Sequence, residues 1–438
     1  MPTILAIAAL FLLATDALNL ELSVLPGLSA KNLLIYFIAV LLALRMVMGR
    51  ASIMVAGQMQ AAFIVQIMYA AITMLLVALI LEYPSYNLMD SIIRLKSALI
   101  DHFIFFAVFL FGVRSADDAV KVIKGLLLGA LFLNALTILD AMGIVNIGFE
   151  IREDGRTTGA IGESNQYAAF LVLLLPANIA AAVAAKGVQR LFWLGASGVA
   201  AFALVMTASR GGFVGLAMSI AVGAYLYRHL ISYSRAMGWV MGAMVLMVLI
   251  VALSPYGGLL AERMIGQTGS IDVNDASSGR SEIWSDALAV MYQNPITFIT
   301  GYGWNAYASM PFYFSPHNHY LSLWFNLGLV GLFCGVYLLF SAIGRARRAS
   351  AIARPPYRGQ LIAFVLGAVG LCTAVFFVDL HKPWYYFWMY GGLVMKLALC
   401  VNEQPALAPV SVPRPRLPAK SRDPYGWAQP QQQTQDPA

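Results

Sequence analysis

Charged residues and cysteines are both scarce in this sequence. Only 11% of its 438 residues are Asp, Glu, Lys or Arg, and 60% are hydrophobic, whereas soluble proteins carry about 25% charged and about 45–50% apolar residues. The three cysteines, Cys334, Cys372 and Cys400, lie within apolar segments, which argues against a disulfide framework or a zinc cluster and favours core packing. The composition therefore excludes an ordinary soluble domain and indicates folding in a lipid bilayer.

Apolar runs long enough to cross a bilayer as helices recur along the chain. They predict an all-α, polytopic transmembrane bundle of about twelve helices, including a first span that we do not interpret as a cleaved signal peptide. The expected spans are 2–20, 32–49, 61–81, 98–113, 120–141, 166–185, 191–208, 212–227, 239–254, 317–343, 359–378 and 384–400.

The distribution of charge over the connecting loops predicts the orientation. With both termini in the cytoplasm, that side receives 19 of the 28 basic residues, and the opposite side receives 16 of the 21 acidic ones. Short loops rich in Lys and Arg stay in the cytoplasm during insertion. We therefore expect a multi-pass protein of the bacterial inner membrane, and the net charge of +7 reflects orientation rather than affinity for nucleic acid.

Four segments follow from this reading. Residues 1–254 hold the first nine helices, 255–316 form one large periplasmic loop, 317–400 hold the last three helices, and 401–438 are a disordered cytoplasmic tail rich in Pro and Gln. Within the loop, 259–265 is expected to be a short amphipathic piece. Residues 280–292 are expected to form a helix with one apolar stripe.

Arginines at the expected periplasmic face are the first candidates for chemistry. Arg210 stands in a tight Ser-Arg-Gly-Gly reversal between two apolar helices, where an arginine costs roughly 2.5–3.5 kcal/mol on insertion scales unless it has a partner. Arg280 opens the loop helix, and Arg152 and Arg156 lie in the loop 148–162. A guanidinium suits phosphate, but Arg210 could also snorkel to lipid headgroups, and Arg152 and Arg156 could pair with neighbouring acids.

Two histidines, His317 and His319, lie where the large loop enters the tenth expected helix. A histidine with a pKa near neutral can act as a general base, although the segment could equally be a polar helix cap. A zinc site would need further ligands, for which Asp379 and His381 are the nearest candidates. A nuclease reading of His317-Asn-His319 is rejected because the acidic loop lacks a basic surface.

In this order, the motifs resemble the O-antigen ligase and polymerase family of membrane glycan transferases over roughly residues 150–340. The resemblance rests on Arg156-Thr-Thr-Gly-Ala-Ile-Gly-Glu-Ser-Asn165, Ser209-Arg210-Gly211, Gly279-Arg280 with Ile283-Trp284 and Gly301-Tyr302-Gly303, and His317-Asn318-x-Tyr320-Leu321 ending at Leu327-Gly328. At Asn326, many relatives carry an acidic residue. About twelve helices with a large late periplasmic loop also match the family's architecture.

The resemblance implies an inverting transfer of a glycan from undecaprenyl diphosphate to an acceptor hydroxyl, with no cofactor and no metal. Arg210 and Arg280 would bind the diphosphate, and His317 would activate the acceptor, which is lipid A-core or a growing glycan. Arg156, Asn165, Asn318 and His319 are further candidates for substrate contact. His319 is also an alternative base, although on a helix it would point to a different face from His317.

Three other functions stay open. Within the family, a polymerase that extends repeat units is an alternative to a ligase, in O-antigen or exopolysaccharide synthesis. A polysaccharide transporter or flippase would also have twelve helices, but its charges should lie near the middle of the membrane, whereas here they collect at one face. A structural membrane partner would tolerate replacement of Arg210, Arg280 and His317.

Overall fold

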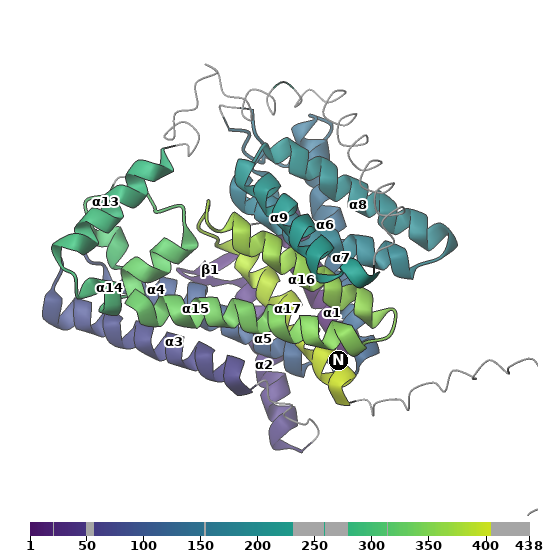
Figure 1. The fold of residues 1–438 in the computed structure, drawn as a ribbon, viewed down its shortest axis with the longest axis horizontal. Coiled ribbons are helices and arrows are strands. Elements are labelled where there is room, and N and C mark those ends of the chain that lie inside the picture. The colour runs from purple at the N-terminus through teal and green to yellow at the C-terminus, as the bar shows by residue number, and fades with distance from the viewer. Residues whose placement is uncertain are drawn as a thin grey trace, which may run out of the picture. The chain divides into compact units, whose positions relative to one another are not determined.

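The computed structural model describes residues 1–20, 22–49, 57–152, 155–230, 258, 279–312 and 314–403. All of these except Glu403 belong to one compact unit, Met1–Asn402, and Glu403–Ala438 form a second unit. The expected ninth span at 239–254, the piece at 259–265 and nearly all of the expected tail lie outside the described residues. Of the described residues, 79% are helical, as the scarcity of charge and the long apolar runs predict (Figure 1).

The N-terminal half contains six α-helices and one hairpin. The helices are α1 (Pro2–Ala17), α2 (Ala30–Val47), α3 (Gly57–Leu76), α4 (Leu88–Leu95), α5 (Asp101–Phe111) and α6 (Ala116–Ala141). Strands β1 (Ser23–Leu25) and β2 (Leu28–Ser29) pair antiparallel between α1 and α2, a hairpin that the hydropathy pattern did not predict. Two π-helical turns, η1 (Val77–Leu81) and η2 (Lys96–Ile100), extend α3 and join α4 to α5.

The remaining helices carry the predicted motifs. They are α7 (Ser164–Ala184), α8 (Gly187–Thr207), α9 (Arg210–Leu226), α13 (Arg280–Gln293), α14 (Thr297–Thr300), α15 (His319–Ile352), α16 (Tyr357–Ala374) and α17 (Lys382–Glu403). Three short 3-10 turns connect them: η3 (Gly159–Ile161), η4 (Arg228–Leu230) and η5 (Ala306–Ser309). The predicted loop helix at 280–292 is confirmed as α13.

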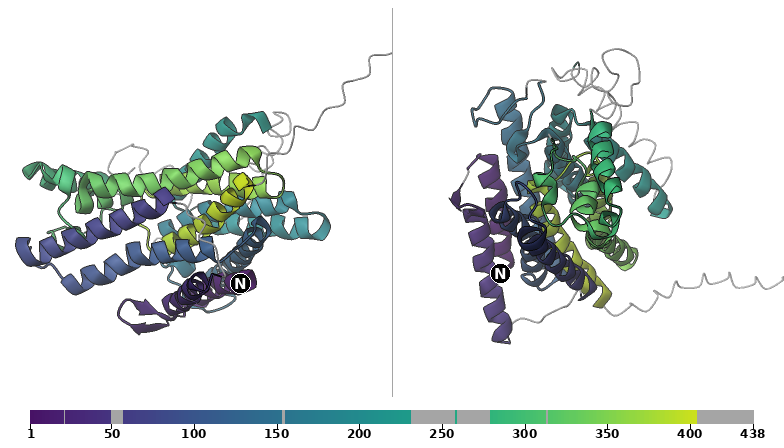
Figure 2. Two further views of the ribbon diagram at one scale, coloured as in Figure 1. Left: turned by 90° about the horizontal axis from the view of Figure 1, so that it is seen from below. Right: turned by 90° about the vertical axis from the view of Figure 1, so that its left-hand side faces the viewer.

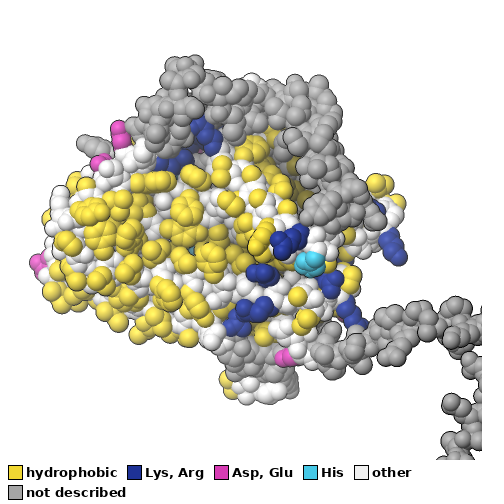
Figure 3. All heavy atoms as spheres, viewed as in Figure 1, with side chains coloured by type: hydrophobic (Ala, Val, Ile, Leu, Met, Phe, Trp, Pro, Cys, Tyr) yellow, Lys and Arg dark blue, Asp and Glu magenta, His cyan; other side chains and the backbone are white. Residues whose placement is uncertain are grey.

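Seven helices among the described residues are long and apolar enough to cross a membrane: α2, α3 with η1, α6, α7, α8, α15 and α16. Helices α1 and α9 are apolar but shorter. Hydrophobic side chains cover much of the face shown in Figure 3, and Phe333, for example, is 70% exposed. Lipid rather than water suits such a surface. The chain is thus an all-α, multi-pass membrane protein, and the predicted total of twelve spans is not confirmed.

Helix α7 occupies the interior of the unit and packs against α8, α9 and α16. Glycines allow this close approach, because a Cβ atom on Gly367 of α16 would lie 2.1 Å from the carbonyl oxygen of Leu173 in α7. Gly215 of α9 meets α16 in the same way, at 2.6 Å from the carbonyl oxygen of Gly370. Small residues serve in membranes to bring helix backbones together.

Helix α15 is kinked at Gly328, whose φ is 60° and ψ is −158°. The kink interrupts the helical ladder, and the backbone N–H groups of Tyr302 and Gly303 donate to the carbonyl oxygens of Phe325 and Asn326, both at 2.8 Å. The Gly301-Tyr-Gly303 motif is therefore a docking segment for the large loop. Beyond the kink α15 continues alongside α3, as the left view of Figure 2 shows.

Candidate active site

The loop that precedes α7 is held against the end of α8. Ile151 and Thr157 form an antiparallel bridge, and the Thr158 hydroxyl donates to the carbonyl oxygen of Glu150 at 2.6 Å. The N–H of Thr157 donates to the carbonyl oxygen of Met206 in α8 at 3.4 Å. Arg156, within this loop, is only 5% exposed.

Asn165 and Arg210, which are far apart in sequence, are linked through Ser209. The Glu163 carboxylate caps α7 by accepting from the N–H groups of Asn165 and Gln166. The Asn165 amide N–H donates to Glu163 at 2.8 Å, and its oxygen accepts from the Ser209 hydroxyl at 2.8 Å. Ser209 in turn caps α9, so Arg210 is the first residue of that helix.

The segment 375–381, between α16 and α17, lies next to this helix start. A Cβ atom on Gly211 would lie 2.9 Å from Cβ of Phe377, so only glycine allows the approach. The N–H of His381 donates to the side-chain oxygen of Gln166 at 2.9 Å, and the N–H of His319 donates to the carbonyl oxygen of Val375 at 2.9 Å. The segment thus contacts α7, α9 and α15 at one end of the bundle.

Arg280 and His317 are brought together by α13. Gly279, with φ of 76°, precedes the helix, and Arg280 is its first residue. One turn later the indole N–H of Trp284 donates to the carbonyl oxygen of Pro316 at 2.8 Å, which ties α13 to the residue before His317. The positive charge of Arg280 acts on the His317 imidazole and lowers its pKa.

His317 is half-buried and its backbone is in the left-handed region, with φ of 47°. Burial is the main cause of its lowered pKa, and the nearby Arg280 and Arg152 guanidinium groups lower it further, while Glu163 acts in the opposite direction. Because the ordinary histidine pKa is about 6.5, the imidazole is neutral at pH 7. A neutral imidazole beside cations is able to accept a proton.

Asp379, in segment 375–381, supports the backbone conformation of His317. Its carboxyl accepts the backbone N–H of His317, and burial raises its pKa to about 7. Sequence reasoning considered Asp379 only as a remote metal ligand. No group of three or more His, Cys, Asp or Glu side chains that could hold a metal ion occurs within the described residues.

Asn318 and His319 have local roles that separate them from His317. The Asn318 side-chain oxygen accepts from the N–H groups of Tyr320 and Leu321 at 3.0 and 3.1 Å, so Asn318 is the N-cap of α15, as the alternative reading of the sequence held. The His319 ring lies 4.9 Å from the Trp384 ring, centroid to centroid, and lines a small cavity with His102. The two histidines thus occupy different environments.

Asn326 bonds to the loop rather than to the histidine. Its oxygen accepts from the N–H of Tyr307 at 3.0 Å, and its amide N–H donates to the carbonyl oxygen of Ser322 at 2.8 Å. The first bond attaches η5 to α15, and the second holds the amide against the preceding turn of α15. An acidic side chain could make only the first of these bonds.

The predicted residues therefore fall into two groups. The first group is His317 with Arg280, Arg152 and Glu163, whose charges act on the pKa of its imidazole. The second group is Arg210 and Asn165, which are joined through Ser209. Both groups lie at the end of the bundle that segment 375–381 contacts. Cations at this end of the bundle could bind an anionic leaving group, and the neutral base beside them could deprotonate a hydroxyl.

One family model matches this part of the chain, that of the O-Antigen ligase family, over residues 195–336. The matched stretch includes Arg210, Arg280 and His317, and it ends short of segment 375–381. A comparison with curated proteins gives no match. The resemblance inferred from the motifs is confirmed.

Proposed function

We propose, from the premise that this chain is a member of the O-antigen ligase family, that it transfers an undecaprenyl-diphosphate-linked glycan to an acceptor hydroxyl. The membership supports a membrane enzyme of glycan transfer in O-antigen biosynthesis. The proposal adds the donor, the bacterial inner membrane, cytoplasmic termini and a site at the periplasmic face. The acceptor is lipid A-core, or a growing glycan if the protein is a polymerase of O-antigen or exopolysaccharide.

The observation that carries the proposal is the half-buried His317, which the bond from Trp284 to Pro316 ties to the helix that begins with Arg280, and whose pKa is lowered by burial and by the charge of Arg280. A general base must be unprotonated at the working pH, and burial together with neighbouring positive charge keeps His317 so. The same charge would stabilise a departing diphosphate, and such preorganised groups contribute most where water is excluded. One arrangement thus supports both halves of the reaction.

The residues of the proposed site account for each bond and for the proton in the transfer step. The acceptor oxygen forms a bond to the anomeric carbon, the bond from that carbon to the diphosphate oxygen breaks, and the bonding electrons leave with undecaprenyl diphosphate. His317 takes the hydroxyl proton. Arg280 and Arg210 bind the diphosphate and balance its growing charge. Attack opposite the leaving group inverts the anomeric centre.

The other candidates have more limited roles in the proposal. Arg156 and His319 stay as possible contacts to substrate. Asn165 and Asn318 use their amide oxygens for Ser209 and for the α15 cap, so any contact to substrate would come from the amide nitrogen. The proposed site draws on both the helices of 1–254 and the loop 255–316, and it is completed by helices of 317–400.

The test is complementation of a deletion strain with Arg210→Ala, Arg280→Ala or His317→Ala at matched membrane abundance. Arg228→Ala is the control, because Arg228 follows α9 at the end away from Arg210. Loss of surface polymer with long glycans accumulating on undecaprenyl diphosphate indicates a ligase, and accumulation of single repeat units indicates a polymerase. Full polymer in all three variants would overturn the assignment in favour of a transporter or a structural role.

A further inference from the structure

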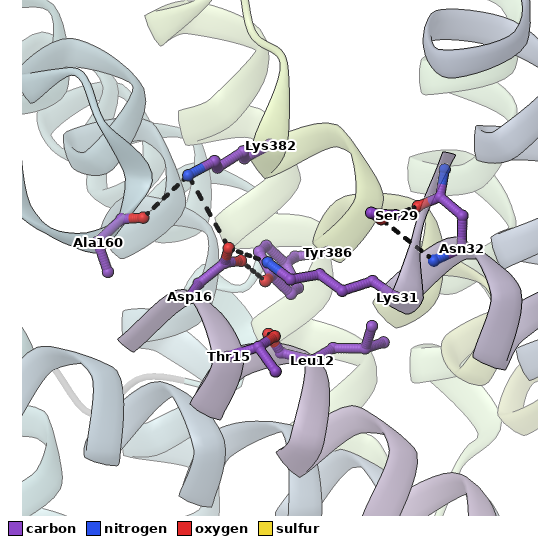
Figure 4. Close-up of polar contacts among 9 residues, drawn as sticks. All are labelled: Leu12, Thr15, Asp16, Ser29, Lys31, Asn32, Ala160, Lys382 and Tyr386. Atoms are coloured by element: carbon purple, nitrogen blue, oxygen red, sulfur yellow. Dashed lines mark hydrogen bonds and ion pairs between the residues drawn. The ribbon is translucent and has the colours of Figure 1, made fainter. Parts of the chain in front are cut away.

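A second cleft lies between the first helices and the start of α17. It measures about 360 Å³ and is bounded by the end of α1, the β1–β2 hairpin and the beginnings of α2 and α17. Its lining combines leucines with a small group of charged residues, Asp16, Lys31 and Lys382 (Figure 4). Clefts of this size, mainly apolar with a few polar groups, are usual for small ligands.

Two cations share one carboxylate in this cleft. Lys31 forms an ion pair with Asp16, and the Tyr386 hydroxyl donates to the other carboxylate oxygen. The Lys382 ammonium lies 3.9 Å from Asp16 and donates to the carbonyl oxygen of Ala160 at 3.3 Å. Close by, Lys96 is matched by Asp101, to which it donates at 2.8 Å. Among the described residues that line the cleft, two ammonium groups, of Lys31 and Lys382, face one carboxylate, that of Asp16, which leaves a surplus of one positive charge.

The surplus charge is accessible from the cleft. The Asp16 side chain is 5% exposed, whereas those of Lys31 and Lys382 are 21% and 45% exposed. An ammonium group has three donors, and those of Lys382 are not exhausted by one carbonyl and one distant carboxylate. An anion entering the cleft would thus meet two ammonium groups before it met the covered carboxylate.

Apolar side chains surround the charged group. Leu20, Leu22, Leu25 and Leu28 line the cleft, and the hairpin also exposes apolar surface, with Val24 57% and Leu25 61% exposed. In water such a surface would be unfavourable, whereas beside lipid chains it is well accommodated. The cleft thus combines exposed positive charge with an apolar wall.

We propose that this cleft binds the phosphate headgroup of an anionic membrane lipid, with the phosphate between Lys31 and Lys382 and the hydrocarbon chain along the hairpin leucines. Lysine is a common phosphate ligand that acts as a point charge, and a lipid supplies the anion and the apolar part together. The residues that line this cleft do not include His317, Arg280 or Arg210. The inference does not depend on the transfer reaction.

Binding can be measured on the full-length protein in detergent micelles. Native mass spectrometry with added phosphatidylglycerol should show one tightly held lipid in the wild type. Lys382→Gln should weaken its binding about tenfold, whereas Lys382→Arg, which keeps the charge, should not. Lys186→Gln is the matched control, because Lys186 is exposed beyond the other end of α7, and it should bind as the wild type does.

Binding of other ligands, measured in the same way, identifies the source of the phosphate. Phosphatidylcholine, which is zwitterionic, should bind at least several-fold more weakly than phosphatidylglycerol, and inorganic phosphate should bind far more weakly than either. Undecaprenyl phosphate binding more tightly than phosphatidylglycerol, with the same dependence on Lys382, would support the site with a prenyl lipid as its occupant. Leu25→Ser should weaken binding of lipid but not of inorganic phosphate, and it keeps the test available should Lys382→Gln fail to fold.

Three results would overturn the proposal. Unchanged binding of phosphatidylglycerol in a folded Lys382→Gln protein would mean that the surplus charge holds no lipid. Equal binding of the zwitterionic lipid would remove the role of charge. Equal affinity for inorganic phosphate would show a free-anion site without a lipid chain.

Discussion

The indole N–H of Trp284 donates to the carbonyl oxygen of Pro316 at 2.8 Å, so the helix that begins with Arg280 is joined to the residue before His317. The bond crosses from α13 to the start of α15. Because the pKa of His317 responds to Arg280, the distance between the two side chains matters for the proposed chemistry. This one bond helps to set it.

Trp284→Phe should therefore lower the rate of glycan transfer strongly and the free energy of unfolding only slightly. The change keeps an aromatic ring but removes the donor, at a cost of about 0.5–1.5 kcal/mol, and a small misplacement of reacting groups can cost about a hundredfold in rate. Thermal unfolding and transfer from a lipid-linked donor measure the two effects. Trp324→Phe is the control, because it loses a comparable bond to the Phe298 carbonyl away from His317, and equal loss of transfer in both variants would contradict the prediction.

The pH dependence of transfer should have an acidic limb governed by His317. The folded pKa is lowered, so the imidazole remains a base down to a pH below about 6.5, and activity falls as the pH drops through the folded pKa. Arg152 lowers this pKa and Glu163 raises it. Arg152→Gln should move the limb of kcat/KM to higher pH and Glu163→Gln should move it to lower pH, with glutamine still able to cap α7. Limbs that move in the same direction would refute His317 as the titrating base.

Asn326→Asp should destabilise the protein. The new carboxylate keeps the bond from Tyr307 but faces the Ser322 carbonyl without a donor, which costs about 1–3 kcal/mol. Asn318→Asp is the contrast, because the cap of α15 needs only an acceptor. Melting temperatures in one detergent compare the two, and the idea fails if Asn326→Asp is the more stable variant.

Gly328→Ala should prevent normal folding. The φ of 60° disfavours a side chain, and a Cβ atom would lie 2.1 Å from the carbonyl oxygen of Ile299, a backbone atom that cannot move without displacing the docked loop. Gly344→Ala on the same helix has Arg348 Nη1 at 3.7 Å as its nearest neighbour and should fold normally. The folded yield after detergent extraction distinguishes them, and equal yields would contradict this account of the kink.

The sequence predicted those features that depend on neighbouring residues. Helix α13 begins at Arg280 and carries its stripe as expected, and Asn318 caps α15, because spacing and capping are local properties. It did not predict the β1–β2 hairpin, which is only a few residues long. It also began the span 98–113 too late, because the helix starts with α4 at Leu88 and continues through η2 into α5.

The arrangement around His317 could not be derived in this way. Arg280 and the histidine motif could be proposed only from residue type and order, while their proximity depends on Trp284 reaching Pro316. Asp379, which reaches the N–H of His317, lies in the segment between α16 and α17, and no periodic pattern encodes that contact. The same is true of Asn326, whose partner Tyr307 lies in the preceding loop.

The docked loop at Gly301–Gly303 has a consequence for synthesis of the protein at the ribosome. Thr300 accepts from Tyr69, and Trp304 donates to Ser91, across sequence separations of 231 and 213 residues. The N–H groups of His317 and His319 find their acceptors only in segment 375–381. These hydrogen bonds therefore cannot form while only the early helices have entered the bilayer. The site around His317 can form only after α16 has left the ribosome.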